Sequence, residues 1–144
     1  MTTDTTNELP ILYGTDDIAR LNERAGYHFF EPGSMRFFRS RIGAFVGQSR
    51  DRRVAVFVTS EKGPRDTNAR RYSARIFDVE RGDVIESVHG FQAFATARTA
   101  ARNGQRFLDA YNAQEWPNGL MRAEYHKPES FSGWIVRAGF SGKG

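Results

Sequence analysis

Cysteine is absent from the chain, so the sequence excludes disulfide bridges, a thiol nucleophile and a zinc site with cysteine ligands. An apolar run of about 18 residues is also absent, and we therefore expect no transmembrane helix. The N-terminal stretch MTTDTTNELPIL has neither the basic start nor the apolar centre of a signal peptide. From these absences we expect a protein that stays in the cytoplasm and does not contact membranes.

Lysine is scarce. Only Lys62, Lys127 and Lys143 are lysines among the 21 basic residues, and the net charge is +4. The guanidinium group of arginine binds phosphate through two parallel hydrogen bonds, so a predominance of arginine fits phosphate recognition. The alternative explanation of the arginine excess is a GC-rich genome, which encodes arginine where other genomes encode lysine. The composition therefore leaves nucleic-acid binding open without establishing it.

Motifs that carry chemistry are scarce as well. The three histidines, His28, His89 and His126, are far apart and lie in no metal-binding pattern. The acidic clusters at 16–17 and 78–83 suit a helix start and a turn better than acid–base catalysis. The chain has no nucleophile elbow and no Walker phosphate loop. We therefore predict no catalytic residues, no metal site, no cofactor and no enzyme activity.

The N-terminal part of the chain predicts an arm followed by a short helix. Residues 1–10 are polar and end in Pro10, which is typical of a disordered arm. Thr15 is a suitable N-cap for a helix over residues 16–25. Gly26 is placed to end that helix.

The stretch SMRFFRSRIGAFV, residues 34–46, allows two interpretations. It reads either as one strand or as a helical turn over residues 35–39 followed by a strand over 41–47. Ser34 directly before the apolar residues favours the second interpretation. Its aromatic residues, with those of YHFF just before it, are too many to leave in water. We expect most of them in the core, with arginines at the edge of the core.

Three further runs predict the rest of an antiparallel sheet. VAVFV, residues 54–58, is apolar on both faces and predicts a central strand, which the polar loop 62–69 follows. RRYSARIFD alternates between apolar and polar residues. Gly82 suits the turn of a hairpin that returns along VIESV, residues 84–88.

The main helix is expected to begin after Thr96, with an apolar stripe formed by Ala97, Ala100, Ala101, Gly104, Phe107, Leu108 and Tyr111. Residues 113–144 form a tail rich in glycine and aromatic residues, with the strand-like piece GWIVRAGF. The sequence thus predicts an α+β fold: a three- to four-stranded antiparallel sheet covered by one main C-terminal helix, with a short N-terminal helix and an irregular tail. Residues 11–112 form its single domain. Whether the tail is ordered, and what the oligomeric state is, stay open.

Arginines gather in three places of this predicted fold. If the outer sheet face and the first hairpin loop are exposed, they form a basic surface for phosphates. The alternative is a solvated face balanced by nearby carboxylates. The predicted nucleic-acid contacts are Arg50, Arg52 and Arg53 in the loop, Arg71 and Arg75 on one strand face, and Arg98, Arg102 and Arg106 on one ridge of the main helix.

A second hypothesis is a protein-interaction or inhibitory module that acts on a host or phage protein. Its candidate surface is the aromatic part of the tail, comprising Trp116, Tyr125, Phe131 and Trp134. Both hypotheses describe a binding protein without catalytic activity.

The blocks YHFFEPGSMRFFRSRI, FVTSE, RRYSARIFDVERGDVI and GFQAFAT resemble a family of small uncharacterised proteins from actinobacteria and their bacteriophages. The resemblance covers residues 27–108. It implies an intracellular accessory protein, encoded by a phage, without an established activity, and a GC-rich host that accounts for the arginine excess. The element order also resembles the arm-binding domain of tyrosine integrases and double-stranded-RNA-binding domains. Neither contact motif is present, so this likeness of layout carries little weight for function.

Overall fold

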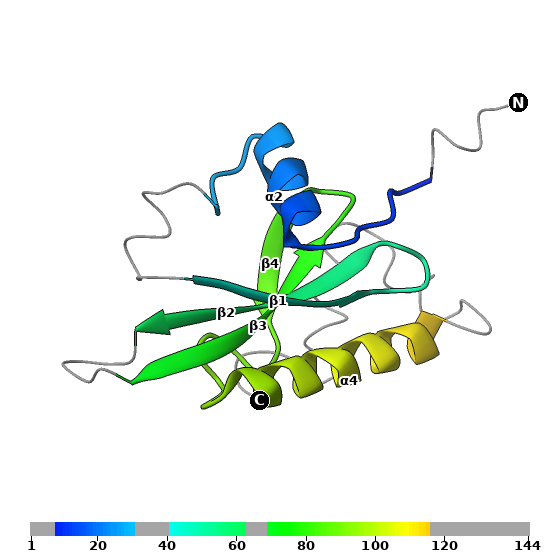
Figure 1. Cartoon of the computed structure of the whole chain (residues 1–144). Helices are drawn as coiled ribbons and strands as arrows, with labels where there is room; N and C mark the ends of the chain where they lie inside the picture. The colour runs from blue at the N-terminus through cyan, green and yellow to red at the C-terminus, as the bar shows by residue number, and fades with distance from the viewer. Residues whose placement is uncertain (1–7, 31–40, 63–68, 116–144) are drawn as a thin grey trace, which may run out of the picture.

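A computed structural model of the chain describes residues 8–30, 41–62 and 69–115, and the following account is confined to them (Figure 1). The fold is α+β, as predicted, with a four-stranded antiparallel sheet between two helices. The elements in chain order are α2 (Thr15–Arg24), β1 (Arg41–Gln48), β2 (Val54–Lys62), β3 (Arg70–Asp78), β4 (Asp83–Ser87) and α4 (Ala97–Glu115).

The sheet is a meander in which each strand pairs with the next one along the chain. The β2–β3 register is regular from Val54↔Asp78 to Lys62↔Arg70, and β2 is buried along almost its whole length, which confirms the predicted central strand. Gly82 has a φ of 76° in the β3–β4 turn, a conformation that side chains rarely adopt. The predicted hairpin is therefore confirmed together with the reason for its glycine.

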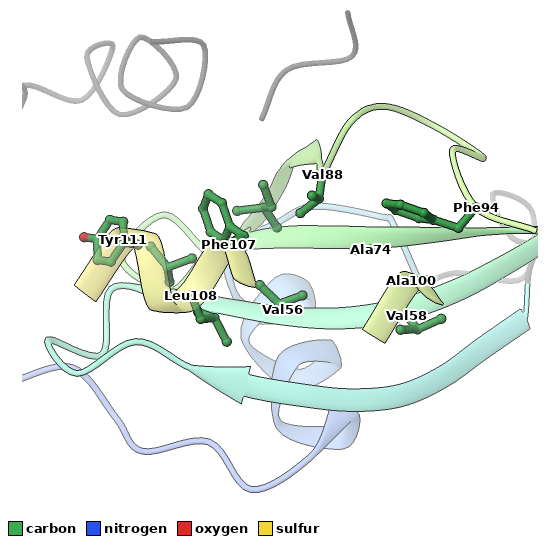
Figure 2. Packing of buried hydrophobic residues seen from close by; sticks show 11 residues of the cluster. Val56, Val58, Ala74, Val88, Phe94, Ala100, Phe107, Leu108 and Tyr111 are labelled. Atoms are coloured by element: carbon green, nitrogen blue, oxygen red, sulfur yellow. The ribbon is translucent and has the colours of Figure 1, made fainter. Parts of the chain in front are cut away.

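Helix α4 covers one face of the sheet. Its start is capped as predicted, because the Thr99 backbone N–H donates to Thr96 Oγ1 at 3.1 Å. Ala100, Phe107, Leu108 and Tyr111 are buried against β2 and β3 (Figure 2), in a cluster that also contains Val56 and Ile76. The predicted apolar stripe is thus confirmed from Ala100 onward, whereas Ala97 in the first turn is exposed.

The second face of the sheet is also covered, which the sequence did not predict. Helix α2 lies on this face with Ile18 fully buried, and Figure 1 shows α2 and α4 on opposite sides of the strands. Phe29 and Phe30 pack on Phe57 of β2, with ring centroids 6.2 and 5.7 Å from its own. These two aromatics are partly buried and pack against the core, in line with the expectation. The second cluster comprises Leu12, Ile18, Ala55, Phe57, Phe77 and Val79.

The N-terminal segment differs from the predicted disordered arm from residue 8 onward. The Gln48 side chain donates from Nε2 to the Pro10 carbonyl and accepts from the Leu12 N–H, both at 2.9 Å. Leu9 and Leu12 pack into the core of the α2 face. The arm is held because two leucines bury apolar surface and one glutamine satisfies its backbone groups.

The start of α2 differs from the sequence prediction as well. The helix begins at Thr15, with Gly14 as its N-cap and no side-chain cap, so the assignment of Thr15 as N-cap is wrong. Asp17 turns back instead and accepts a hydrogen bond from the Tyr13 N–H at 2.6 Å. The end of α2 matches the prediction, since Gly26 has a φ of 91°.

Some predictions lie outside the described residues. They are the helical turn at 35–39, most of the loop 62–69 and nearly all of the tail 113–144 with its strand-like piece.

Candidate nucleic-acid interface

Three arginines form a row on the exposed face of α4. Arg98, Arg102 and Arg106 are all exposed and lie on the side of the helix opposite the buried stripe, as their spacing predicts. At a rise of about 1.5 Å per residue, the row is about 12 Å long. In the ranges that the structure describes, none of the three forms an ion pair. We call these three residues the α4 row.

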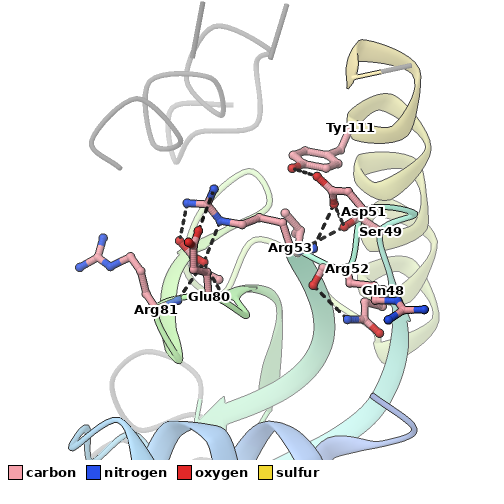
Figure 3. Close-up of polar contacts among 10 residues, drawn as sticks. Gln48, Ser49, Asp51, Arg52, Arg53, Glu80, Arg81 and Tyr111 are labelled. Atoms are coloured by element: carbon pink, nitrogen blue, oxygen red, sulfur yellow. Dashed lines mark hydrogen bonds and ion pairs between the residues drawn. The ribbon is translucent and has the colours of Figure 1, made fainter. Parts of the chain in front are cut away.

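The loop between β1 and β2 is attached to the C-terminal end of α4. The Tyr111 hydroxyl donates to Asp51 Oδ2 at 2.9 Å (Figure 3). The Arg50 backbone N–H donates to Asn112 Oδ1, also at 2.9 Å. Ser49 completes the loop by donating from Oγ to the other oxygen of Asp51. Exposed Arg50 is thereby positioned beside the last turns of α4, near the C-terminal end of the α4 row.

Arg53, a second arginine of this loop, is used within the fold. Its guanidinium binds Asp78 through two hydrogen bonds, Nε to Oδ1 at 3.0 Å and Nη2 to Oδ2 at 3.2 Å, and its side chain is only 13% exposed (Figure 3). Burial alone lowers the pKa of Arg53, but the hydrogen bonds and charge of Asp78 outweigh it, so the pKa is raised. Arg53 therefore holds the two hairpins together, and its guanidinium is engaged within the fold.

Arg52 is also engaged within the fold. Its backbone is left-handed with a φ of 68°, and its Nη1 donates to the Leu9 carbonyl at 3.1 Å. Glu8 lies 3.6 Å from the same nitrogen. Of the three predicted loop arginines, Arg50 is the exposed one, whereas Arg52 and Arg53 are partly buried and position the arm and the β3–β4 turn.

The predicted basic face of the sheet is wrong. Arg75 lies on the α2 side, only 12% of its side chain is exposed, and its Nη2 is 3.0 Å from Oε2 of fully buried Glu61. The guanidinium also lies over the rings of Phe29 and Phe91, 5.2 and 5.0 Å from their centroids. Arg71 donates from Nε to the Gln92 carbonyl. The prediction failed because it assumed that only one face of the sheet is covered.

Sequence reasoning also missed the buried carboxylate of Glu61. It accepts hydrogen bonds from Thr59 and Ser73, in addition to the one from Arg75. The signal was present in the alternation of β2, which places Glu61 on the same face as Phe57. A charged residue at the end of an apolar run was instead assigned to solvent.

Other kinds of site have little support in the described ranges. No three histidine, aspartate or glutamate residues there are grouped so as to hold a metal ion. A shallow pocket of about 150 Å³ lies between the arm and α2, lined by Pro10, Ile11, Leu12, Asp17, Arg20, Leu21 and Arg24. None of the described helices combines the length and the apolar character needed to span a bilayer. The tail residues Trp116, Tyr125, Phe131 and Trp134 lie outside the described residues.

Fold and candidate site together define a small α+β protein with a basic helix on one face. The chain belongs to the family of unknown function DUF7447, whose model matches residues 15–105, more than half of the chain. This agrees with the expected uncharacterised family. The matched region runs from the start of α2 into α4 and includes Arg98 and Arg102. No curated protein and no solved structure matches the chain.

Proposed function

We propose that this protein is a non-catalytic accessory protein that binds nucleic acid through the phosphate backbone, using the α4 row and the neighbouring Arg50. Guanidinium groups bind phosphate oxygens through paired, charge-assisted hydrogen bonds. Such contacts release counterions, so the affinity falls steeply as salt rises. The proposed interface contains four of the eight arginines predicted from the sequence, and it lies on one side of the molecule.

The observation that carries this proposal is the placement of the α4 row, which by like-charge repulsion opposes the stability of its own helix. Arg98–Arg102 and Arg102–Arg106 are like-charge pairs at i,i+4, each of which costs about 0.2–0.5 kcal/mol in an isolated helix. Arg98 also lies in the first turn, where the helix dipole disfavours a cation, and this turn contains no acidic residue. A row of charges that opposes the stability of the fold is typical of a surface kept for binding.

The test is a comparison of two triple variants by fluorescence anisotropy. Arg98→Gln, Arg102→Gln and Arg106→Gln together remove the α4 row, and Arg24→Gln, Arg41→Gln and Arg81→Gln remove three other exposed arginines. Both variants lose the same charge. On labelled duplex DNA, the plot of log affinity against log salt should flatten by about two to three in the first variant, at about 0.9 per phosphate contact. The control variant should keep the slope of the unaltered protein.

A thermal melt of the same variants supplies an independent readout. Because the α4 row opposes the helix, the α4 triple variant should melt at a higher temperature than the unaltered protein while it binds more weakly. Equal loss of binding in both triple variants would show that only the net charge matters. Absence of binding by the unaltered protein at low salt would end the proposal.

The source and the cell compartment are part of the same proposal. The sequence blocks that resemble actinobacterial and phage proteins support a phage-encoded protein that acts in the host cytoplasm. The genes beside the coding sequence provide the direct check, since this proposal expects phage replication or regulation genes there. Neighbouring genes of a purely bacterial operon would contradict the phage origin without affecting the proposed binding.

A further inference from the structure

We propose that the α4 row recognises double-stranded DNA and contacts the backbone on both sides of the major groove. This inference rests on the proposed function and specifies its substrate class. Three features of the α4 face support it: among the described residues, no exposed aromatic side chain there could stack on bases; the row has a suitable length; and the helix is rigid.

The first feature distinguishes a duplex from a single strand. Proteins that bind single strands stack the unpaired bases on exposed aromatic side chains. Among the described residues, the exposed large apolar side chains are Ile11, Tyr13, Ile42 and Phe91, and none of them belongs to α4 or to the loop that carries Arg50. The aromatics of α4 itself, Phe107 and Tyr111, are buried. The α4 face therefore offers charge and hydrogen bonds, which suit a backbone whose bases remain paired.

The second feature is the length of the α4 row. Arg98 and Arg106 are about 12 Å apart along the helix axis, and the major groove of B-form DNA is about 12 Å wide. The two outer arginines can therefore reach phosphates on opposite walls of the groove. Arg102, between them, faces the groove itself. The A-form RNA duplex has a deep and narrow major groove, which does not match this length.

The third feature is that the helix carrying the α4 row is held in a fixed position on the sheet. Gly104 lets α4 approach β2 so closely that a Cβ at this position would lie 2.7 Å from Val56 Cγ1. Tyr111 and Asn112 attach the β1–β2 loop to the C-terminal part of α4. A row of charges on a rigidly placed helix suits the regular, stiff backbone of a duplex better than it suits a flexible single strand.

The contacts should carry little sequence information. Backbone contacts do not distinguish bases, and only Arg102 is placed to reach a base edge. Asp109 limits the basic surface at the C-terminal end, where its carboxylate accepts from Gln105 Nε2 at 3.0 Å. We therefore expect a short and weakly selective footprint.

The experiment measures binding of the full chain to four labelled probes by anisotropy at one low salt concentration. They are a DNA duplex of about 25 base pairs, one of its single strands, an RNA duplex of the same sequence, and the DNA duplex with glucosylated hydroxymethylcytosines that fill the major groove. The plain duplex should bind at least about tenfold more tightly than each of the other three. A second DNA duplex of unrelated sequence should bind within about threefold of the first.

The four probes test the substrate class, the placement in the groove and the proposed function separately. Equal or tighter binding to the single strand or to the RNA duplex would overturn duplex DNA as the substrate and leave nucleic-acid binding intact. Unchanged binding to the glucosylated duplex would overturn the groove placement. No binding to any probe would overturn the proposed function itself, so the two failures are distinguishable.

Discussion

Glu61 and Arg75 form an ion pair on the α2 face of the sheet, with Glu61 fully buried and their charged atoms 3.0 Å apart. Removal of one partner leaves the other charge buried without compensation, at a cost of about 3–5 kcal/mol. We predict that Arg75→Met lowers the free energy of unfolding by about this amount. Urea denaturation followed by circular dichroism measures the change.

The double variant Glu61→Leu with Arg75→Met separates the ion pair from the packing around it. Because an apolar pair of similar volume replaces two buried charges, the double variant should be more stable than Arg75→Met alone. Arg41→Gln serves as the matched control, since it removes one exposed arginine outside the α4 row. A loss of less than about 1 kcal/mol in Arg75→Met would show that water or another cation compensates Glu61.

Asp17 provides a pH-dependent contribution to stability. The hydrogen bond from the Tyr13 N–H holds the pKa of Asp17 below its ordinary value of 3.8; desolvation opposes this shift, and the charge of Arg20 adds to it. A carboxyl with a lowered pKa in the folded state stabilises the fold fully above its unfolded pKa. This stabilisation is lost as the pH falls through the folded pKa. Asp17→Asn should therefore be less stable than the unaltered protein at neutral pH.

The stability difference between the two proteins should shrink as the pH falls below 3.8. Thermal melts across the acidic range measure it. Asp16→Asn, at the exposed neighbouring position, makes the same change in charge and keeps the bond to Tyr13. A constant difference between Asp17→Asn and the unaltered protein at all pH values would contradict the assignment.

At the scale of the elements, Gly104 sets how closely α4 lies on the sheet. Alanine is favoured over glycine in a helix by about 1 kcal/mol, so an exposed glycine would gain stability on substitution. At Gly104 the new Cβ would lie 2.7 Å from Val56 Cγ1, and Val56 is fully buried. We predict that Gly104→Ala lowers the free energy of unfolding by about 1–2 kcal/mol, because overpacking outweighs propensity. Urea denaturation tests the prediction.

The exposed neighbour Gln105 provides the control for this substitution. Gln105→Ala leaves the packed face unchanged and should alter stability by no more than about 0.5 kcal/mol. A stabilised Gly104→Ala would mean that α4 can move away from β2 at little cost. The α4 row would then lack the fixed geometry that duplex recognition requires.

The helices and strands were largely predictable because their signals are local. The apolar run in β2, the alternation in β3, the glycine at 82 and the Thr96 cap each depend on a few neighbouring residues. The sheet face on which α2 packs is not a local property. An amphipathic helix shows that it buries one side, but its periodicity does not show what covers that side. The burial of Arg75 was missed for this reason.

The same distinction applies to the candidate site. The α4 row was predictable because i,i+4 spacing opposite an apolar stripe determines a shared, exposed face. The roles of Arg52, Arg53 and Arg75 were not, since each depends on a partner distant in the sequence: Leu9, Asp78 and Glu61. Arginine composition therefore overestimates the basic surface, because part of it stabilises the fold.

At the scale of the whole molecule, the sheet separates two layers with different tasks. The α2 layer, with the arm and Phe29, buries apolar surface and the Glu61–Arg75 pair. The α4 layer, on the opposite side of the sheet (Figure 1), buries the second core. The arginines of the α4 row are exposed. The α4 row thus lies on the face opposite α2, whereas Arg50 shares the β1–β2 loop with Arg52, which contacts the arm. Damage to the arm should affect stability without a direct effect on binding.

Truncation of the arm tests this separation. Deletion of residues 1–13 removes Leu12, which is 6% exposed, with Leu9 and the backbone partners of Gln48. Burial of one leucine contributes about 1.5–3 kcal/mol, so the loss should total about 2–4 kcal/mol. For a domain of this size, the melting temperature should fall by roughly 10 °C or more.

Deletion of residues 1–7 is the matched control, since it retains the described contacts of Leu9, Pro10 and Leu12, and it should leave the melting temperature close to that of the full chain. Below its own melting temperature, the longer deletion should bind duplex DNA with the affinity and salt slope of the full chain, because the α4 row is on the other layer. Equal melting temperatures for the two deletions would contradict the role of the arm. Loss of binding in a deletion variant that is still folded would show that the arm side of the molecule also contacts the nucleic acid, and the interface would then extend beyond α4.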